Sequence, residues 1–463
     1  MPQTERIIAM PHSSRPHVLV LMCDQMQHQR MTFLDPVAHT PFLNELAAES
    51  TRFSHAYTCH GQCVPARAAF QTGLFPHECG IMAIYGFHGH GARLTAKYTT
   101  LGHCFREAGY DTAYFGKTHF GVPLDELGYD TGIEHRPIDD DEAERLGTLH
   151  VPKPLRPDYM ACDQTVEFLR AYRPSERPLF LTFSTNLPHP PFFTEPRWAE
   201  RFFAPALDLP HSYYAETFRD KPAFQGEHAL DGRHGALDEL AQRRELAQYY
   251  TMIAEMDSHF ARVKAEYERL GLWDDTVVLF IADHGDMMGA HKMRLKGTLP
   301  YDELYRIPCM LKLPRGTGTV RTTVNDLVSS VQAPATLLKS AGIEVPAQFH
   351  NGDFYDALFR AEAPEDEHIF FEHYAAYWGI HPFYAVRDRR TKYVRYYGDD
   401  ACEEMYDLQR DPHELHNLAN DPQHAARRTA LAERADSWWQ KTNGRDLAYY
   451  ESDYFKSNQH NRV

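Results

Sequence analysis

The sequence predicts an α/β fold, in which a β-sheet is covered on both faces by helices, followed by a smaller α+β region. Two observations support this prediction. Short apolar runs typical of buried strands alternate with amphipathic helical patterns through the first three quarters of the chain. From about residue 350 the pattern changes to short strand-like pieces separated by turns. We therefore expect a large N-terminal domain over residues 1–350 and a C-terminal domain over residues 351–463.

The individual elements follow from local patterns. Apolar runs predict buried strands at His17–Met22, Asp111–Phe115, Leu179–Ser184, Thr276–Ala282 and Cys309–Leu313. A helix is expected at Pro41–Glu49, and apolar side chains at i, i+3 and i+4 predict a long helix over Asp238–Leu270 that Gly271 ends. In the C-terminal part we expect strands at His368–Glu372, Phe383–Arg387 and Lys392–Arg395 and a helix at Ala425–Trp439. The polar stretches Asp139–Pro157 and Arg219–Gly235 are expected to be surface insertions.

The composition excludes several classes of protein. The chain has 463 residues, with 48 Lys and Arg against 64 Asp and Glu, which gives a formal net charge of −16. This acidic balance argues against a nucleic-acid binder and requires a local positive pocket for any anionic substrate. No apolar run approaches the roughly 20 residues of a membrane helix, and Met1–Pro16 lacks the apolar core of a signal peptide. We expect a cytoplasmic protein without membrane contact, and self-association into a homo-oligomer stays open.

The eight cysteines are too few for a disulfide scaffold. Cys59 and Cys63 are four residues apart, as in half of a zinc site, but no matching second pair follows them. The role of Cys63 must therefore be inferred from its own neighbours.

Polar side chains follow four of the predicted strands. They are Asp24-Gln25, Gly116-Lys117-Thr118-His119, Asn186-Leu187-Pro188-His189 and Asp283-His284-Gly285-Asp286. Ligand sites of open α/β sheets form beyond the carboxyl ends of the strands, so these side chains are expected in one crevice. Asp24, Gln25, Asp283 and His284 would suit one divalent cation, since their oxygens favour Ca²⁺ or Mg²⁺ and the imidazole favours Mn²⁺. The simpler alternative is that Asp24 caps a helix and that residues 283–285 form a turn.

The segment Cys63-Val64-Pro65-Ala66-Arg67, with Thr72-Gly73 after it, suggests a reactive cysteine. Pro65 suits the first turn of a helix and Gly73 its end, which places Cys63 at a helix N-terminus. The helix dipole there favours negative charge and lowers the pKa of a thiol, and Arg67 lies one turn further on. Cys63 is therefore a candidate nucleophile or anion site. The alternative is a half-buried cysteine in front of a helix.

The pattern Cys63-X-Pro65-X-Arg67 with Thr72-Gly73 resembles the signature of the sulfatase family within the alkaline phosphatase superfamily. Its companions appear in the same order. They are Asp24-Gln25, Gly116-Lys117-Thr118-His119, Pro188-His189-Pro190-Pro191-Phe192, Asp283-His284-Gly285, His291 with Lys296, and Tyr406-Asp407-Leu408. The resemblance implies an alkaline-phosphatase-like fold with a large mixed sheet between helices, and makes the N-terminal domain the catalytic one.

The resemblance also implies a chemistry. Cys63 would be oxidised to formylglycine by a formylglycine-generating or equivalent maturation enzyme. One Ca²⁺ or Mn²⁺ ion would be held by Asp24, Gln25, residue 63, Asp283 and His284. The substrate would be a small-molecule sulfate ester, and Arg67, Lys117 and Lys296 would hold the sulfate oxygens and the nucleophile. His119 or Lys296 would protonate the leaving group, with His189 as the other candidate acid. Outside the resemblance, Lys117 has the alternative of an exposed loop lysine, and Lys296 that of a partner of Asp302 or Glu303.

The metal set departs from the commonest sulfatase pattern at Gln25 and His284. This variant resembles choline-sulfatase-like enzymes and phosphonate monoester hydrolases of the same superfamily. The Lys117 and His119 pair favours a sulfatase, whereas a phosphonate monoester or phosphodiester hydrolase, or an inactive binding protein on this scaffold, is the alternative. Candidates for the leaving-group pocket are His60, Tyr85, His291, His373 and Trp378.

Overall fold

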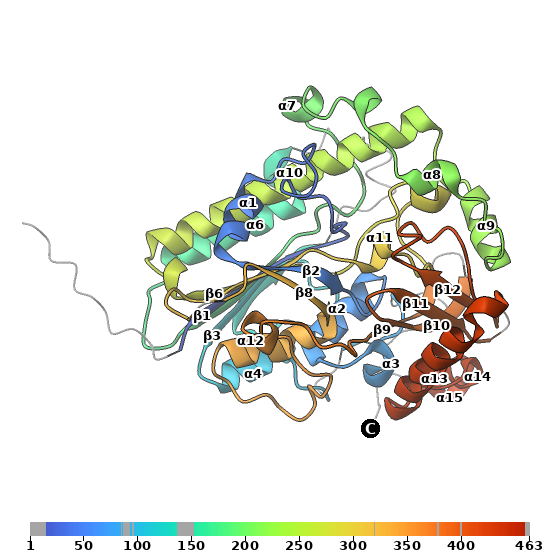
Figure 1. Cartoon of the computed structure of the whole chain (residues 1–463). Helices are drawn as coiled ribbons and strands as arrows, with labels where there is room; N and C mark the ends of the chain where they lie inside the picture. The colour runs from blue at the N-terminus through green and yellow to red at the C-terminus, as the bar shows by residue number, and fades with distance from the viewer. Residues whose placement is uncertain are drawn as a thin grey trace, which may run out of the picture.

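The computed structural model describes residues 15–84, 86, 93–94, 97–136, 152–318, 320–376, 379–398 and 401–458. Its centre is an eight-stranded sheet with the order β4-β3-β5-β1-β6-β7-β2-β8 (Figure 1). The strands are β1 (His17–Cys23), β2 (Thr51–Tyr57), β3 (Asp111–Gly116), β4 (Thr131–Glu134), β5 (Leu179–Ser184), β6 (Thr276–Ala282), β7 (Cys309–Lys312) and β8 (Thr323–Ser329). Only β7 runs antiparallel to its neighbours, so the predicted mixed sheet is confirmed.

Helices cover both faces of this sheet, as the alternation of strands and helices predicts. In Figure 1 one face carries α1 (Pro41–Glu49), α6 (Pro157–Ala171) and α10 (Glu239–Arg269). The other face carries α2 (Cys63–Thr72), α4 (Leu101–Glu107) and α12 (Ala333–Ser340). The strands in the middle read as continuous apolar runs because they are buried on both sides, and every residue of β1, β5 and β6 is buried. The shorter helices of this part are α3 (Pro76–Cys79), α7 (Pro196–Ala199), α8 (His211–Ala215), α9 (Ala223–Leu230) and α11 (Asp302–Tyr305).

The long helix α10 begins and ends within one residue of its predicted bounds. The Asp238 carboxylate caps its N-terminus by accepting hydrogen bonds from the backbone N–H groups of Leu240 and Ala241. Gly271 follows its last turn with a φ of 72°, a conformation that suits glycine. No helix of the described residues is long and apolar enough to cross a membrane.

The C-terminal part forms a second, antiparallel sheet with the order β12-β11-β10-β9. Its strands are β9 (Ile369–Ala376), β10 (Gly379–Arg387), β11 (Thr391–Tyr396) and β12 (Glu403–Asp407). The helices α13 (Ala425–Lys441), α14 (Leu447–Glu451) and α15 (Asp453–Asn458) follow it. Phe371 and Phe383 of this sheet share a hydrophobic core with Tyr57, Leu304 and Tyr305 of the large part. The domain boundary near residue 350 stays a prediction.

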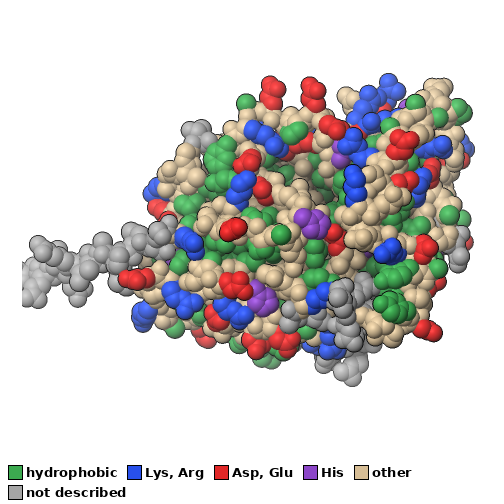
Figure 2. Space-filling model, turned by 90° about the horizontal axis from the view of Figure 1, so that it is seen from below, with side chains coloured by type: hydrophobic (Ala, Val, Ile, Leu, Met, Phe, Trp, Pro, Cys, Tyr) green, Lys and Arg blue, Asp and Glu red, His purple; other side chains and the backbone are tan. Residues whose placement is uncertain are grey.

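Four strands and one insertion differ from the sequence-based expectation. Strands β2, β4, β8 and β12 carry too many polar residues to be recognised by apolar pattern. The stretch Arg219–Gly235 is more than a surface insertion, because it contains α9 and buries Lys221 and Gln225. Residues 137–151 of the other expected insertion lie outside the described residues. Figure 2 shows acidic and basic side chains interspersed over the face seen from below.

Candidate active site

The carboxyl ends of four neighbouring strands bring the predicted site residues together. Strands β3, β5, β1 and β6 are adjacent and parallel, so the residues that follow each of them lie at one edge of the sheet. Asp24 follows β1, Lys117 follows β3, His189 comes after β5, and Asp283 follows β6. The side chains of Asp24 and Lys117 are both buried and contact each other directly, so Lys117 is not an exposed loop residue.

Helix α2 delivers Cys63 to the same place. Cys63 is the first residue of the helix, and Gly73 ends it with a φ of 66°, as the sequence predicts. A Cβ atom at Gly73 would lie 2.4 Å from the ring of Phe349, so the close packing there also requires glycine. The Cys63 Sγ atom is fully buried and lies 2.8 Å from Lys296 Nζ and 3.2 Å from His284 Nε2. Lys296 thus points at Cys63, and its ammonium group also donates to Gln25 Oε1.

The surroundings of Cys63 favour an anion. Burial and the Asp24 carboxylate raise the pKa of the thiol, but Lys117, Lys296 and His284 outweigh both and hold that pKa well below its usual value. The N-terminus of α2 adds its positive dipole end to these groups. The position therefore stabilises negative charge on whatever group residue 63 carries.

Four side chains at the strand ends and at the start of α2 each offer one atom that could bind a metal ion. They belong to Asp24, Cys63, Asp283 and His284, and the four atoms all lie within 4.8 Å of one another. Burial and the neighbouring charge of Asp24 raise the pKa of Asp283, which shows that the two carboxylates repel each other. The Nδ1–H group of His284 donates to the Gly285 carbonyl at 2.7 Å, which leaves Nε2 facing the carboxylates. Two crowded buried carboxylates and an oriented imidazole fit a divalent cation.

Arg67 organises the site from the side. Its Nε atom donates to Asp283 Oδ2 at 2.7 Å, and its Nη1 atom donates to the carbonyl of Lys117 and to Ser184 Oγ. Arg67 lies on α2 one helical turn after Cys63, as the sequence predicts. Its hydrogen bonds, however, go to Asp283 and to the ends of β3 and β5. A guanidinium group that is fixed in this way ties together three of the four strand ends.

Gln25 is held in a strained backbone conformation by its neighbours. Its φ is 70°, in the left-handed region that non-glycine residues rarely adopt. Its N–H group donates to Asp283 Oδ1 at 3.0 Å, and its carbonyl accepts from the Tyr249 hydroxyl at 2.6 Å. Its side-chain amide donates to Asp286 at 2.5 Å and accepts from Lys296 Nζ at 2.7 Å. The amide oxygen that the sequence assigns to a metal therefore faces Lys296 in this arrangement.

Tyr249 is a residue of the site that sequence reasoning missed, whereas Asp286 was expected in the crevice but was given no role. Asp286 lies in the motif after β6, but its type alone gave no role for it. Tyr249 lies on α10, more than two hundred residues from Gln25, and its only sequence signal is its place on the apolar face of that helix. Its hydroxyl also accepts a hydrogen bond from the backbone N–H of Gln27 at 2.9 Å.

The two candidate acids are neutral imidazoles in this environment. Burial, with Lys296 and Lys117 nearby, lowers the pKa of His189 to about 3. Its Nδ1–H donates to the Pro190 carbonyl at 2.6 Å, so Nε2 carries the lone pair. Burial and Lys117 also lower the pKa of His119, whose side chain lies within hydrogen-bonding reach of Cys63. Both groups are thus suited to accept a proton before they donate one.

The candidates for the leaving-group pocket separate into two groups. His60 and His373 are buried and stack at 4.6 Å between ring centroids, beside the site. His291 instead hydrogen-bonds Glu216 at 2.5 Å and stacks on Tyr301, while Tyr85 and Trp378 lie outside the described residues. A cavity of about 40 Å³ borders Gln25, His189 and Lys296, and its other wall includes Arg233 and His234, which sequence reasoning missed.

Known proteins resemble this chain over most of its length. A family model described as sulfatase matches residues 16–343, and one described as N-sulphoglucosamine sulphohydrolase, C-terminal, matches residues 289–441. A choline-sulfatase of Rhizobium meliloti (strain 1021) is 28% identical over 445 residues, which cover 89% of this chain and 83% of that protein. An uncharacterized sulfatase of Escherichia coli (strain K12) is 26% identical over 444 residues, which cover 88% of this chain and 84% of that protein. The solved phosphonate monoester hydrolase of Agrobacterium radiobacter shares the fold, with a TM-score of 0.77, 23% identity, and coverage of 94% of this chain and 97% of that chain.

Proposed function

Because the chain belongs to the sulfatase family of hydrolases, we propose that it cleaves an aryl or small organic sulfate monoester to a phenol or alcohol and inorganic sulfate. The observation that carries this proposal is the set of groups around Cys63. Three basic side chains, Arg67, Lys117 and Lys296, lie with two buried carboxylates in one crevice of a strongly acidic protein. A sulfate monoester is an anion, so its binding needs such a local excess of positive groups.

We assign the roles from the contacts. Lys117 and Lys296 flank residue 63 and would hold the sulfate oxygens, while Arg67 fixes Asp283 and the loop of Lys117. His119 and His189 are neutral imidazoles, so each has a ring nitrogen whose lone pair can accept a proton from the nucleophile. Lys296, an ammonium with three donors, would then supply the proton to the departing oxygen of the alcohol or phenol. Overall, one water is consumed and the S–O bond to the leaving group is broken.

Two groups would complete the site. Conversion of Cys63 to formylglycine by a maturation enzyme would supply a hydrated aldehyde, whose hydroxyl is the nucleophile. A Ca²⁺ or Mn²⁺ ion held by Asp24, Asp283, His284 and residue 63, with Gln25 turned from Lys296, would supply positive charge for the nucleophile and the sulfate oxygens. The fully buried position of Cys63 at the N-terminus of α2 supports this assignment.

A second candidate is a phosphonate monoester or phosphodiester hydrolase using the same groups. Gln25 and His284 favour it, because a metal set with these two residues resembles that of phosphonate monoester hydrolases. Lys117 and His119 favour the sulfatase, since a cation and an imidazole suit a sulfate oxygen and its leaving group.

One experiment separates the two. The same aryl leaving group is presented on sulfate, phosphonate monoester, phosphate monoester and phosphate diester, and kcat/KM is measured for each. The proposal expects the highest kcat/KM for the sulfate, and loss of activity in Cys63→Ala. A higher kcat/KM for the phosphonate monoester or the phosphate diester than for the sulfate would establish the second candidate instead. Activity that survives Cys63→Ala in pure protein would refute both.

An inactive binding protein on this scaffold is the remaining alternative. It would lack the aldehyde, the metal ion or both. The mass of the peptide that contains residue 63, together with the metal content of the purified protein, tests this directly. An unmodified cysteine in protein made with a functioning maturation enzyme would favour the inactive scaffold.

A further inference from the structure

A second cavity lies far from the residues around Cys63. Its volume is about 610 Å³, within the range of small-ligand sites. One wall is Leu74, His77 and Glu78, which follow the C-terminal end of α2, whereas Cys63 is the first residue of that helix. The helix has 10 residues and a length of about 15 Å, so the cavity is separate from the candidate active site. None of the site residues described above lines it.

The floor of this cavity is built rigidly. His77 is buried and its two ring nitrogens are both used, one in a contact with Glu372 and the other at 3.1 Å from the Thr442 carbonyl. Its ring also packs against Trp439 at 4.5 Å between centroids. The Tyr450 hydroxyl accepts a hydrogen bond from the backbone N–H of Arg445 at 3.0 Å. The cavity is therefore largely formed before any ligand enters, which lowers the cost of binding.

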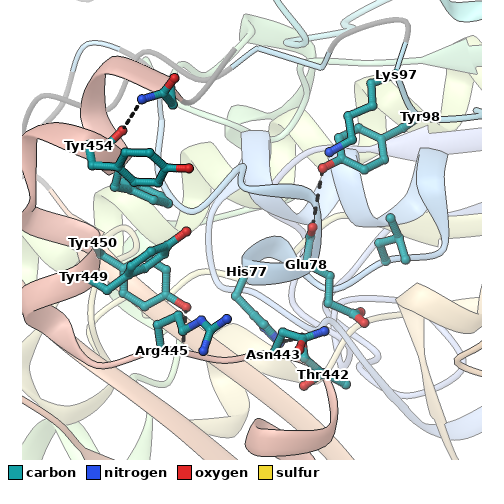
Figure 3. A pocket seen from close by; sticks show the side chains of 13 residues that line it. His77, Glu78, Lys97, Tyr98, Thr442, Asn443, Arg445, Tyr449, Tyr450 and Tyr454 are labelled. Atoms are coloured by element: carbon teal, nitrogen blue, oxygen red, sulfur yellow. Dashed lines mark hydrogen bonds between the residues drawn. The ribbon is translucent and has the colours of Figure 1, made fainter. Parts of the chain in front are cut away.

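The side walls combine aromatic rings with polar groups. Figure 3 shows the tyrosines of the C-terminal helices on one side of the open space and Lys97 with Tyr98 on the other. Tyr454, at the end of the chain, is 69% exposed, which is unusual for a large aromatic side chain. Asn443, Asn458 and Thr442 add amide and hydroxyl groups to the lining. Flat rings with hydrogen-bonding groups around them suit a sugar ring, which has apolar faces and a polar edge.

Two basic side chains, Arg445 and Lys97, line the cavity together with one carboxylate, that of Glu78, which is paired with His350 at 3.0 Å. The Arg445 guanidinium lies 5.7 Å from the centre of the Tyr449 ring, and Lys97 Nζ lies 5.1 Å from that of Tyr98. Among the described residues the Arg445 guanidinium has no carboxylate partner, although the protein as a whole is acidic. An arginine fork of this kind matches a carboxylate or a sulfate group.

We propose that this cavity, which the tyrosines of α14 and α15, Arg445 and Lys97 line, is an accessory binding site for an acidic saccharide. The saccharide ring lies against the tyrosines, and its carboxylate or sulfate group is bound by Arg445 and Lys97. The site acts independently of the chemistry at Cys63, so it goes beyond the proposed hydrolysis.

The test measures binding of three probes to the full chain by calorimetry: tri-galacturonate, a 6-O-sulfated trisaccharide and neutral maltotriose. The sulfated probe is studied in the Cys63→Ala background so that it is not consumed. We expect at least one acidic probe to bind with a Kd below roughly 1 mM, and maltotriose to bind at least about tenfold more weakly. The two acidic probes distinguish a carboxylate ligand from a sulfate ligand.

Variants locate the binding. Arg445→Gln and Tyr454→Ala should each raise the Kd of the acidic probe about tenfold or more. Arg173→Gln is the matched control, because Arg173 is also an exposed arginine that bonds only local carbonyls. It should bind as the parent does, and Arg445→Gln should keep the parent kcat/KM for an aryl sulfate.

Three results would overturn the proposal. They are no binding of any probe at roughly 5 mM, undiminished binding in both cavity variants, or maltotriose binding as tightly as the acidic probes. A protein that binds tri-galacturonate through Arg445 but hydrolyses no sulfate ester would refute the proposed function and leave this site standing.

Discussion

Tyr249→Phe removes one hydroxyl group that holds the backbone of Gln25 in its strained conformation. The ring of Tyr249 is buried and packs against Phe192, and phenylalanine keeps that packing. Among the described residues the Tyr249 hydroxyl makes two hydrogen bonds, one donated to the Gln25 carbonyl at 2.6 Å and one accepted from the Gln27 N–H at 2.9 Å, and both are lost. The substitution therefore isolates the hydroxyl.

The magnitude follows from the two backbone groups that lose their partner. Gln25 and Gln27 are both fully buried, so neither group reaches bulk water. An unsatisfied buried polar group costs about 1–3 kcal/mol, so for the two groups we expect a loss of roughly 2–6 kcal/mol in the free energy of unfolding. Gln25 would also relax from its left-handed conformation and its amide would turn. Because such supporting contacts tune metal affinity, we expect the affinity for the divalent ion to fall about tenfold or more.

Urea unfolding measures the first effect, and titration of metal-stripped protein with Mn²⁺ or Ca²⁺ measures the second. Tyr250→Phe is the matched control, because the Tyr250 hydroxyl is also hydrogen-bonded, to Asp35 and Arg30, but has no contact with Gln25. It should reduce stability without changing metal affinity. A Tyr249→Phe protein that loses less than about 0.5 kcal/mol, or that binds metal as the parent does, would refute the positioning argument.

Four further outcomes are expected. Cys63→Ala should abolish turnover of every ester while circular dichroism stays unchanged; residual turnover near the parent level would contradict the assigned nucleophile. His284→Asn should weaken Mn²⁺ relative to Ca²⁺ in a competition titration, because an amide oxygen replaces an imidazole; unchanged selectivity would exclude His284 as a ligand. His373, whose pKa burial lowers to about 3, stays neutral in the fold while the unfolded chain takes up a proton below about pH 6.5, so stability falls as the pH falls. Between pH 8 and pH 5 the parent should lose about 2 kcal/mol of its free energy of unfolding through His373, and His373→Phe should not show this part of the loss. An unaltered pH profile in the variant would contradict this. Gly116→Ala should prevent soluble expression, because a Cβ there would lie 1.9 Å from the Ser184 carbonyl at a φ of 103°; a stable, active variant would show that this backbone can move.

The sequence predicted the middle of the large sheet and the placement of the site because both depend on parallel strands that are buried on both faces. Strands β1, β5 and β6 are buried on both faces and read as unbroken apolar runs. Parallel strands share a carboxyl edge, so the polar residues that follow them had to meet. The same reasoning placed Cys63 at the start of a helix, because Pro65 and Gly73 have fixed preferences.

Two of the missed elements, β12 and the stretch Arg219–Gly235, contain buried charged residues. Strand β12 contains Glu404, a fully buried carboxylate that accepts a hydrogen bond from Gln225 at 2.5 Å. Lys221 is buried beside Glu216 and Tyr301 in the stretch that was expected to be exposed. A charged residue predicts exposure because burying it is costly unless a partner compensates it. These partners come from distant segments of the chain, so no local sequence pattern shows that the free-energy cost of burying the charge is compensated.

The strained backbone at the site explains why its finer geometry has no sequence signal. Gln25, His119 and Leu295 all have positive φ values, and each of them is at or next to a residue assigned to the chemistry. A positive φ is usually adopted by glycine or asparagine, so the residue types Gln, His and Leu did not indicate this conformation. Strain of this kind persists only where the surrounding contacts fix it, as Tyr249, Asp286 and Asp283 do for Gln25. The polar groups that aim at Cys63 are therefore set by the folded core before substrate arrives, and substitution of a supporting residue such as Tyr249 should weaken metal binding although its side chain is no ligand.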